Sequence, residues 1–159
     1  MTAAGDVVQL VTFRVGGHQF AFDVFQVERV LRYEPPRPLP KAPEYLEGTI
    51  RHGDHAVPVV DLRKRLEVAA ELTEETRIVI LEWEQGKVGV VVDAVLEVLR
   101  VEADEVSAPP GIVKGLAAEY VSGLVTREED TLVLLSTSKL LTSQERLALE
   151  ALTTEKDHE

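Results

Sequence analysis

The feature that most constrains the fold is an internal repeat. The segment YLEGTIRHGDHAVPVVDLRKRL, residues 45–66, aligns without a gap on YVSGLVTREEDTLVLLSTSKLL, residues 120–141, at an offset of 75 (120 − 45). A second match relates FAFDVFQVERVL, residues 20–31, to VGVVVDAVLEVL, residues 88–99, at an offset of 68 (88 − 20). Self-similarity of this kind predicts two related units, which we place in a single domain over residues 1–159, with one lobe at about 1–70 and the other at about 71–159.

The apolar residues form short runs that alternate or are rich in Val, and turn residues separate them. This pattern is typical of strands, and so many short strands favour an all-β fold of barrel-like lobes. Helices are expected to be scarce, with a short turn after Asp61 and a C-terminal helix over about 138–152, where leucines supply an apolar stripe. The predicted strands are 8–15, 18–23, 27–33, 47–52, 55–60, 76–83, 87–93, 96–101, 120–126 and 131–135.

Charge and cysteine usage narrow the function classes. A formal net charge of −11 disfavours nucleic acid as a partner, because binding phosphates needs a surplus of Lys and Arg. The absence of cysteine excludes thiolate metal sites and cysteine nucleophiles and fits a reducing compartment. No signal peptide is recognised, and no apolar run reaches the roughly 20 residues of a membrane span. We expect a cytoplasmic protein that binds other proteins.

Two of the four histidines stand in the tetrapeptide His52-Gly53-Asp54-His55. In the repeat this segment overlies Arg127-Glu128-Glu129-Asp130, a polar link between two apolar strands, and Gly-Asp suits a tight hairpin turn. The alternative is a small metal-assisted hydrolase that uses His52, Asp54 and His55, although such a metal site needs a third ligand. Stoichiometric zinc in the purified protein would favour the hydrolase, and its absence would favour the hairpin.

Nothing else in the sequence indicates catalysis. The phosphate-binding, dinucleotide, zincin and nucleophile-elbow motifs are absent. Asp61, Asp23 and Asp93 each follow an apolar run, where a carboxylate is expected to cap a turn or helix. The strand aromatics, expected in the core, are Phe13, Phe20, Phe22 and Phe25. We therefore predict a protein without enzymatic activity, catalytic residues, metal or cofactor.

Four segments in a fixed order carry a family resemblance. They are FRVGGHQFAFDVFQVERVL (13–31), Gly48 followed by VPVVDLRKRL (57–66), KVGVVVDAVLEVL (87–99) and EYVSGLVTREEDTLVLLSTSKLL (119–141). Together they cover nearly the whole chain, and it resembles the CheW-like domain family, the adaptors that couple chemoreceptors to the histidine kinase CheA in bacterial chemotaxis. The resemblance implies two five-stranded, SH3-like barrels packed against each other, with a third apolar core between them.

The resemblance also implies the partners and their binding surfaces. The expected role is a scaffold at the cytoplasmic ends of receptor arrays that joins methyl-accepting chemotaxis proteins to the regulatory domain of a CheA-type kinase. A pathway that controls pili or gliding instead of swimming is the alternative within the family.

The receptor tip is expected in a groove at Val27, Val30, Leu31, Gly89, Val95 and Val98, although a buried core place is the alternative for each. The kinase contact is expected along the Tyr33-to-Leu39 connector and the Gly48-to-Gly53 hairpin, with Tyr33, Leu39, Gly48, Arg51 and Gly53 as candidates.

Two positions depart from the family pattern. The family usually reads Val-x-Glu-Val where this chain has Val27-Glu28-Arg29-Val30, so a base replaces the expected acid at Arg29. The family usually reads Asn-Leu-Arg-Gly at the hairpin, where this chain has Gly53 and Asp54 in the last two places. One hypothesis is a charge swap in which Arg29 pairs with Asp54 and partner choice changes. The alternative is that Arg29 is solvated and neutral to binding.

Overall fold

The computed structural model describes residues 6–40, 42, 44, 46–65, 68, 71–83, 86–108, 121–127, 130–137 and 140. Nearly all of the regular structure is β. The elements in chain order are β1 (Val7–Val15), β2 (His18–Asp23), the 3₁₀ turn η1 (Val24–Gln26), β3 (Val27–Arg32), β4 (Leu46–His52), β5 (His55–Asp61), α1 (Leu62–Arg65), β6 (Arg77–Trp83), β7 (Gly86–Val92), β8 (Ala94–Glu102), η2 (Ala103–Glu105), β9 (Val106–Ser107), β10 (Val121–Arg127) and β11 (Asp130–Leu135).

Each strand predicted from the sequence is present, with ends displaced by at most two residues. The two-residue strand β9 was not predicted, because a run this short has no periodicity to detect. The helical turn after Asp61 is confirmed as α1. The C-terminal helix predicted over 138–152 lies outside the described residues. No helix within the described ranges is both long and apolar enough to cross a membrane.

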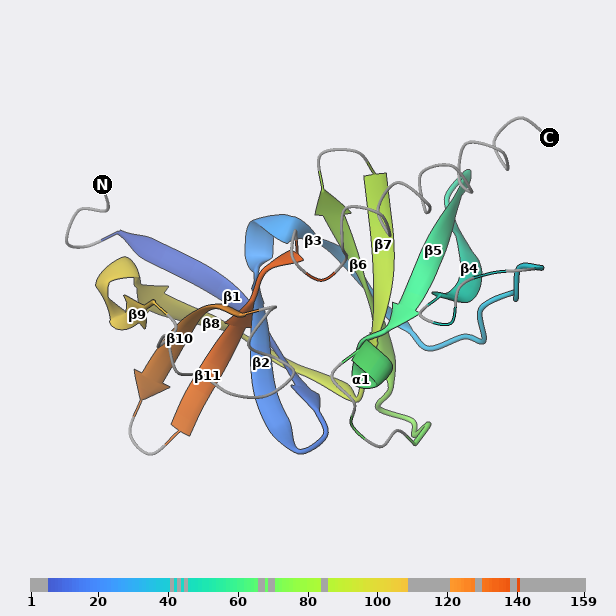
Figure 1. The fold of residues 1–159 in the computed structure, drawn as a ribbon. Coiled ribbons are helices and arrows are strands. Elements are labelled where there is room, and N and C mark those ends of the chain that lie inside the picture. The colour runs from blue at the N-terminus through green and yellow to red at the C-terminus, as the bar shows by residue number, and fades with distance from the viewer. Residues whose placement is uncertain are drawn as a thin grey trace.

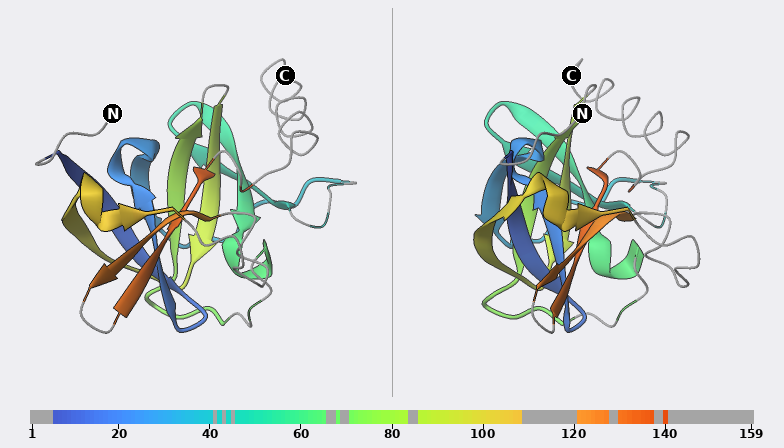
Figure 2. Two further views of the ribbon diagram at one scale, coloured as in Figure 1. Left: turned by 60° about the vertical axis from the view of Figure 1, so that its left-hand side comes forward. Right: turned by 90° about the vertical axis from the view of Figure 1, so that its left-hand side faces the viewer.

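The strands form two sheets that stand side by side (Figures 1 and 2). Lobe A has the order β8-β1-β2-β11-β10-β9, and lobe B has the order β3-β6-β7-β5-β4. Both lobes match the predicted all-β barrel class, although lobe A has six strands where five were expected.

The hairpin repeat is reproduced residue by residue. Ile50 pairs with Val57 in the β4–β5 hairpin, and Val125 pairs with Leu132 in the β10–β11 hairpin, both displaced by 75. Both hairpins carry a bulge at the same place, before Gly48 and before Gly123. The sequence repeat therefore preserves strand register and its irregularity as well as strand type.

The lobes are interleaved rather than consecutive, so the expected boundary near residue 70 does not separate the sheets. β2 lies in lobe A and leads through η1 into β3 of lobe B, whereas β7 lies in lobe B and leads through Asp93 into β8 of lobe A. These two crossings are the segments related by the offset of 68. With β1 and β6 in equivalent places, lobe A without β9 has the same strand order as lobe B.

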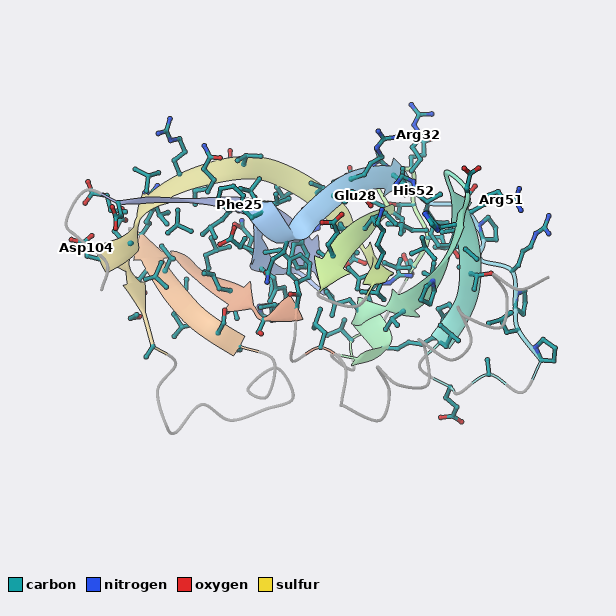
Figure 3. The ribbon with its side chains drawn as sticks, turned by 90° about the horizontal axis from the view of Figure 1, so that it is seen from above. Phe25, Glu28, Arg32, Arg51, His52 and Asp104 are labelled. Atoms are coloured by element: carbon teal, nitrogen blue, oxygen red, sulfur yellow. The ribbon has the colours of Figure 1, made fainter. Side chains whose placement is uncertain are left out.

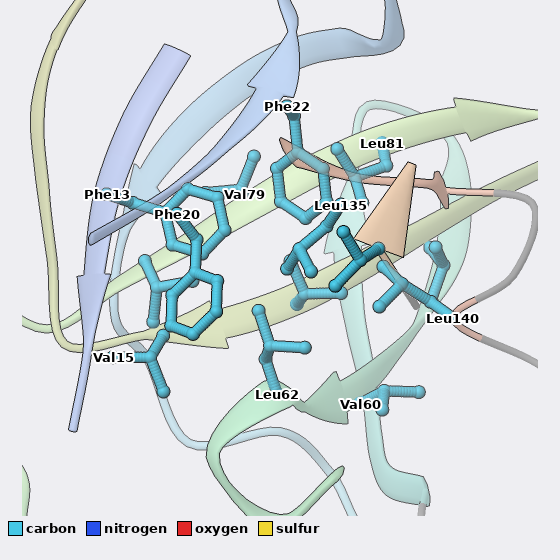
Figure 4. Packing of buried hydrophobic residues seen from close by; sticks show 14 of the residues in the cluster. Phe13, Val15, Phe20, Phe22, Val60, Leu62, Val79, Leu81, Leu135 and Leu140 are labelled. Atoms are coloured by element: carbon cyan, nitrogen blue, oxygen red, sulfur yellow. The ribbon is translucent and has the colours of Figure 1, made fainter. Parts of the chain in front are cut away.

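Three apolar clusters fill the molecule, as the resemblance implied. One lies within lobe B and is centred on Val59, Ile78 and Ile80, and another lies within lobe A around Leu10 and Val101. The largest, called the shared core here, lies between the lobes (Figure 4). Its buried members are Phe13, Val15, Phe20, Phe22, Leu46, Val60, Leu62, Val79, Leu81, Val88, Val90, Val92, Val121, Leu135 and Leu140. Because both sheets contribute to it, neither lobe can bury its inner face alone.

Candidate functional site

An exposed apolar surface lies at the two strand crossings. We call it the crossing surface and define it by Phe25, Val30 and Val98, which expose 88%, 38% and 58% of their area. Val30 and Val98 occupy equivalent places in the offset-68 repeat, on the edge strands β3 and β8. Large apolar side chains exposed on a protein surface are candidates for an interaction site.

Rows of paired side chains connect this surface to the shared core. Val98 on β8 is opposite Val11 on β1, and Val11 is opposite Phe22 on β2. Val30 on β3 is opposite Val79 on β6. Since Phe22 and Val79 belong to the shared core, each row begins in the core and ends at an exposed valine. The apolar rows thus run from the buried core to exposed valines on the edge strands.

Phe25 corrects a prediction made from the sequence. Phe13, Phe20 and Phe22 are buried as expected, with the Phe13 and Phe22 ring centroids 4.7 Å apart. Phe25 is instead the most exposed large apolar residue within the described ranges. Asp23 accepts a hydrogen bond from the backbone N–H of Phe25 at 2.9 Å and so caps η1, which ends the alternation of β2. Figure 3 shows Phe25 where η1 leads into β3.

Four of the six groove positions expected from the resemblance fall into two pairs under the offset-68 repeat, Val27 with Val95 and Val30 with Val98. Val30 and Val98 are exposed, whereas Val27 and Val95 are partly buried against the shared core beneath them. Leu31 is partly buried against the core of lobe B.

Gly89 lies inside the core of lobe B and does not belong to this surface. A Cβ built on it would stand 2.9 Å from Ile78 Cγ2 and 3.5 Å from Val59 Cγ2. Gly89 is buried on β7, which has a neighbouring strand on each side.

The Pro-rich connector between β3 and β4 is held against lobe B. Arg37 and Thr49 exchange backbone hydrogen bonds of 2.8 and 3.0 Å, which adds the connector to the outer edge of β4. Tyr33 packs on the core of lobe B, and Leu39 packs on the shared core.

Gly48 permits the connector to approach this closely. It has φ +144°, and a Cβ built on it would overlap the Arg37 carbonyl oxygen. Of the kinase-contact candidates, Gly48 is therefore buried beneath the connector, whereas Arg51 and Gly53 are exposed on the hairpin. Gly53 has φ +63° in the turn, as its place in a tight hairpin requires.

His52 and His55 face each other across the turn at Gly53 and Asp54, as the hairpin interpretation predicts. His52 is not fully exposed, because its Nε2 lies 3.6 Å from Glu28 Oε2 on β3. Glu28 also accepts a 2.6 Å hydrogen bond from Lys87 Nζ of β7. These contacts join β4 to β3, the two edge strands of lobe B (Figure 3).

The same repeat position joins strands in lobe A. Arg127, the equivalent of His52 at the offset of 75, donates to the Arg100 carbonyl of β8 at 3.0 Å and pairs with Glu105 at 3.1 Å. The two hairpin tips thus share a structural role as well as a sequence position, because each contacts a neighbouring segment of its own lobe.

The expected pairing of Arg29 with Asp54 is not formed. Both side chains are described and exposed, and no ion pair joins them. The bulge between Val27 and Arg29 brings Glu28, rather than residue 29, opposite the hairpin tip. That the altered charges change partner choice stays a prediction.

The Lys87 hydrogen bond lowers the pKa of Glu28 below its ordinary value, although burial opposes it, and the positive charges of Lys87 and Arg29 act in the same direction as the hydrogen bond. A depressed carboxyl pKa means that the folded state holds the proton less tightly than the unfolded chain. The stabilisation is therefore complete above the ordinary pKa of Glu and is lost as the pH falls through the lowered value.

We expect the Glu28→Gln variant to be less stable than the unaltered protein at pH 7, with a difference that shrinks toward pH 3. Urea denaturation at a series of pH values measures it. Glu82→Gln, which removes a carboxylate outside any ion pair of the described residues, is the control. A Glu28→Gln difference that stays constant with pH would contradict this account.

The carboxylates of Asp61 and Asp93, expected from the sequence to cap turns or helices, have structural partners. Arg63, only 3% exposed, donates from Nε and Nη2 to both oxygens of Asp61 at 3.0 and 3.1 Å, and from Nη1 to Asp93 at 3.4 Å. Asp93 accepts a 2.8 Å hydrogen bond from the backbone N–H of Gly16. Asp61 also accepts from the backbone N–H of Arg63, as expected of a cap on α1.

This network joins α1, the β7–β8 crossing and the β1–β2 turn. Burial lowers the pKa of the Arg63 guanidinium, and its hydrogen bonds to Asp61 and Asp93 outweigh that effect and raise it.

Among the described residues, no three His, Asp or Glu side chains gather as a metal site would require.

Comparison with known proteins finds a matching family and several relatives. The model of the CheW-like domain family matches residues 9–145. The chain is 32% identical over 150 residues to the chemotaxis protein CheW of Treponema pallidum, covering 91% of this chain and 88% of that one. It is 31% identical over 140 residues to the protein FrzA of Myxococcus xanthus, covering 86% and 87%. The crystal structure of the scaffolding protein TtCheW from Thermoanaerobacter tengcongensis superposes with a TM-score of 0.80 at 25% identity, covering 88% of this chain and 97% of that one.

Proposed function

Because this chain belongs to the CheW-like domain family, we propose that it is a non-enzymatic adaptor that holds chemoreceptors and a CheA-type histidine kinase together at the cytoplasmic ends of the receptors. Chemotaxis scaffolding is the role of the family, and the phosphorylation chemistry belongs to the kinase. The adaptor needs two binding surfaces that a receptor and a kinase can occupy at the same time.

The crossing surface supports the receptor side of this proposal, and the exposure of Phe25, Val30 and Val98 is the observation that carries it. A helical receptor tip presents apolar side chains at intervals of three and four residues, which can contact exposed apolar side chains on the edge strands of both lobes. Phe25 supplies the aromatic anchor that such interfaces favour. Val27 and Val95, on the same two strands, are partly buried against the shared core.

The connector and the β4–β5 hairpin support the kinase side. The connector is already ordered by its hydrogen bonds to Thr49, so little conformational entropy is lost when a partner binds it. Tyr33, Leu39, Arg51 and Gly53 lie on these segments, which are separate in sequence from Val98 on β8.

The adaptor role does not specify the pathway. Several relatives are named chemotaxis proteins, whereas one is named FrzA. A pathway that controls pili or gliding would use the same two surfaces. Identification of the receptor and the kinase that bind this protein would decide between the pathways.

We expect the Val98→Glu variant to lose at least about tenfold in affinity for a receptor cytoplasmic tip, because a charge would be desolvated in an apolar contact. Titration calorimetry with the purified tip fragment measures this. Val98 suits the test better than Val27, because Val98 is exposed and its replacement leaves the shared core intact. Val7→Glu, at another valine with 48% exposure, is the matched control.

The kinase regulatory domain should bind the Val98→Glu variant as it binds the unaltered protein. Equal receptor affinities for Val98→Glu and Val7→Glu would remove the crossing surface from the proposal.

A further inference from the structure

Three arginines lie on or directly beside the kinase-side segments, and none has an ion-pair partner among the described residues. Arg32 ends β3, Arg37 lies in the connector and Arg51 is on β4, and all three are exposed. We call them the arginine edge. None forms an ion pair within the described part of the chain, although the whole chain carries a formal net charge of −11.

The pairing of the segments brings the arginine edge together. Arg37 and Thr49 form a hydrogen-bonded pair, so their side chains lie on the same side of the ladder, and Arg51 follows on that side two residues later. Arg32 lies on β3, whose Glu28 contacts His52 beside Arg51. In Figure 3, Arg32 lies above His52 and Arg51 lies to the right of it.

Folding does not account for Arg32. It lies directly opposite Arg77 on β6, and like charges in this relation are destabilising. Arg77 donates to the backbone carbonyls of Glu74 and Thr76 at 2.7 and 2.9 Å, so it is satisfied without Arg32.

The acidic residues nearest in sequence to the arginine edge do not neutralise its charge. Glu28 is engaged by Lys87 and His52, and the exposed Glu34 and Asp54 form no ion pair with the arginines. Exposed guanidinium groups with free donors are suited to bidentate contact with carboxylates.

We infer that the arginine edge receives acidic side chains of the kinase regulatory domain, so that the kinase presents Asp or Glu to Arg32, Arg37 and Arg51. This inference rests on the proposed function and adds the chemistry of the partner surface. A protein partner fits better than nucleic acid, because the remaining charge of the chain repels a polyanion. The contact selects a partner with complementary charge and speeds its association.

The test is the binding of the regulatory domain of the CheA-type kinase from the same genome to single charge-reversal variants at several salt concentrations. Arg32→Glu and Arg51→Glu should each weaken binding at least about fivefold at low salt and reduce its dependence on salt. Arg32→Gln should show a smaller loss. Arg100→Glu is the matched control, because Arg100 is the exposed equivalent of Arg32 at the offset of 68 (100 − 32) and changes the net charge equally.

The outcomes separate the two levels of the proposal. Kinase binding that is the same in Arg32→Glu, Arg51→Glu and Arg100→Glu would overturn the inference and leave the adaptor role standing. No binding of the kinase domain to the unaltered protein would overturn the proposed function and the inference together. Urea denaturation of each variant checks that a loss of binding is not a loss of folding.

Discussion

Replacement of Arg63 by Met is expected to lower the free energy of unfolding by about 3–5 kcal/mol, the largest effect of any single polar substitution considered for this protein. Met retains an unbranched apolar chain but removes the guanidinium, which leaves the buried Asp61 without its bidentate partner. The change also releases Asp93 from α1 and removes the 3.0 Å hydrogen bond to the Glu71 carbonyl. Urea denaturation followed by circular dichroism measures the loss.

The adjacent Lys64 is the control for Arg63. Its ion pair with Glu47 is 2.7 Å long, but its side chain is 60% exposed, so Lys64→Met should cost less than about 1 kcal/mol. The double variant Asp61→Asn, Arg63→Met should lose less than the sum of the single losses, because no buried charge is then left unpaired. Equal losses for Arg63→Met and Lys64→Met would contradict the account of the network.

Replacement of Gly48 by Ala is expected to cost at least about 2 kcal/mol, because φ +144° is unfavourable for any residue with a Cβ. The new methyl group would also meet the Arg37 carbonyl, so the connector would have to move away from β4. Denaturation measures the stability, and amide exchange at Thr49 reports whether its hydrogen bond to the connector has been lost.

The Gly53→Ala variant separates the effect of positive φ from the effect of the clash with the connector. Gly53 also has positive φ, at +63°, but a Cβ there would have nothing within 4 Å. This variant should cost about 1 kcal/mol and leave the exchange of the Thr49 amide unchanged. If Gly48→Ala were no worse than Gly53→Ala, the close approach of the connector would not be what requires glycine.

The sequence predicted the strands and hairpins well because their determinants are local. Turn residues and apolar alternation define each strand, and the offset of 75 transfers the register of the β4–β5 hairpin to β10–β11. The interleaving of the lobes was not predicted, since it depends on which distant strands pair. The signal that could have shown it is the second offset of 68, which marks the crossings β2–β3 and β7–β8 as equivalent units of their own.

The candidate site was predicted in part. Val30 and Val98 stood out as apolar strand residues, but alternation alone could not separate them from the buried Gly89 or the partly buried Val27. Phe25 was missed because a phenylalanine next to a strand suggests core, and only the cap by Asp23 turns it outward. Arg63 was missed because one of its carboxylate partners, Asp93, lies 30 residues away in sequence.

The central claim is that one molecule holds receptor and kinase together, and co-sedimentation tests it most directly. Vesicles that carry the receptor's cytoplasmic segment would be mixed with the CheA-type kinase, with and without this protein, and the sedimented kinase measured. The account predicts that kinase sediments in proportion to the protein added, and that Val98→Glu and Arg32→Glu each reduce the sedimented kinase, the first by weakening receptor binding and the second by weakening kinase binding. Sedimentation of kinase that is unaffected by the protein, or competition between receptor and kinase for it, would contradict the account.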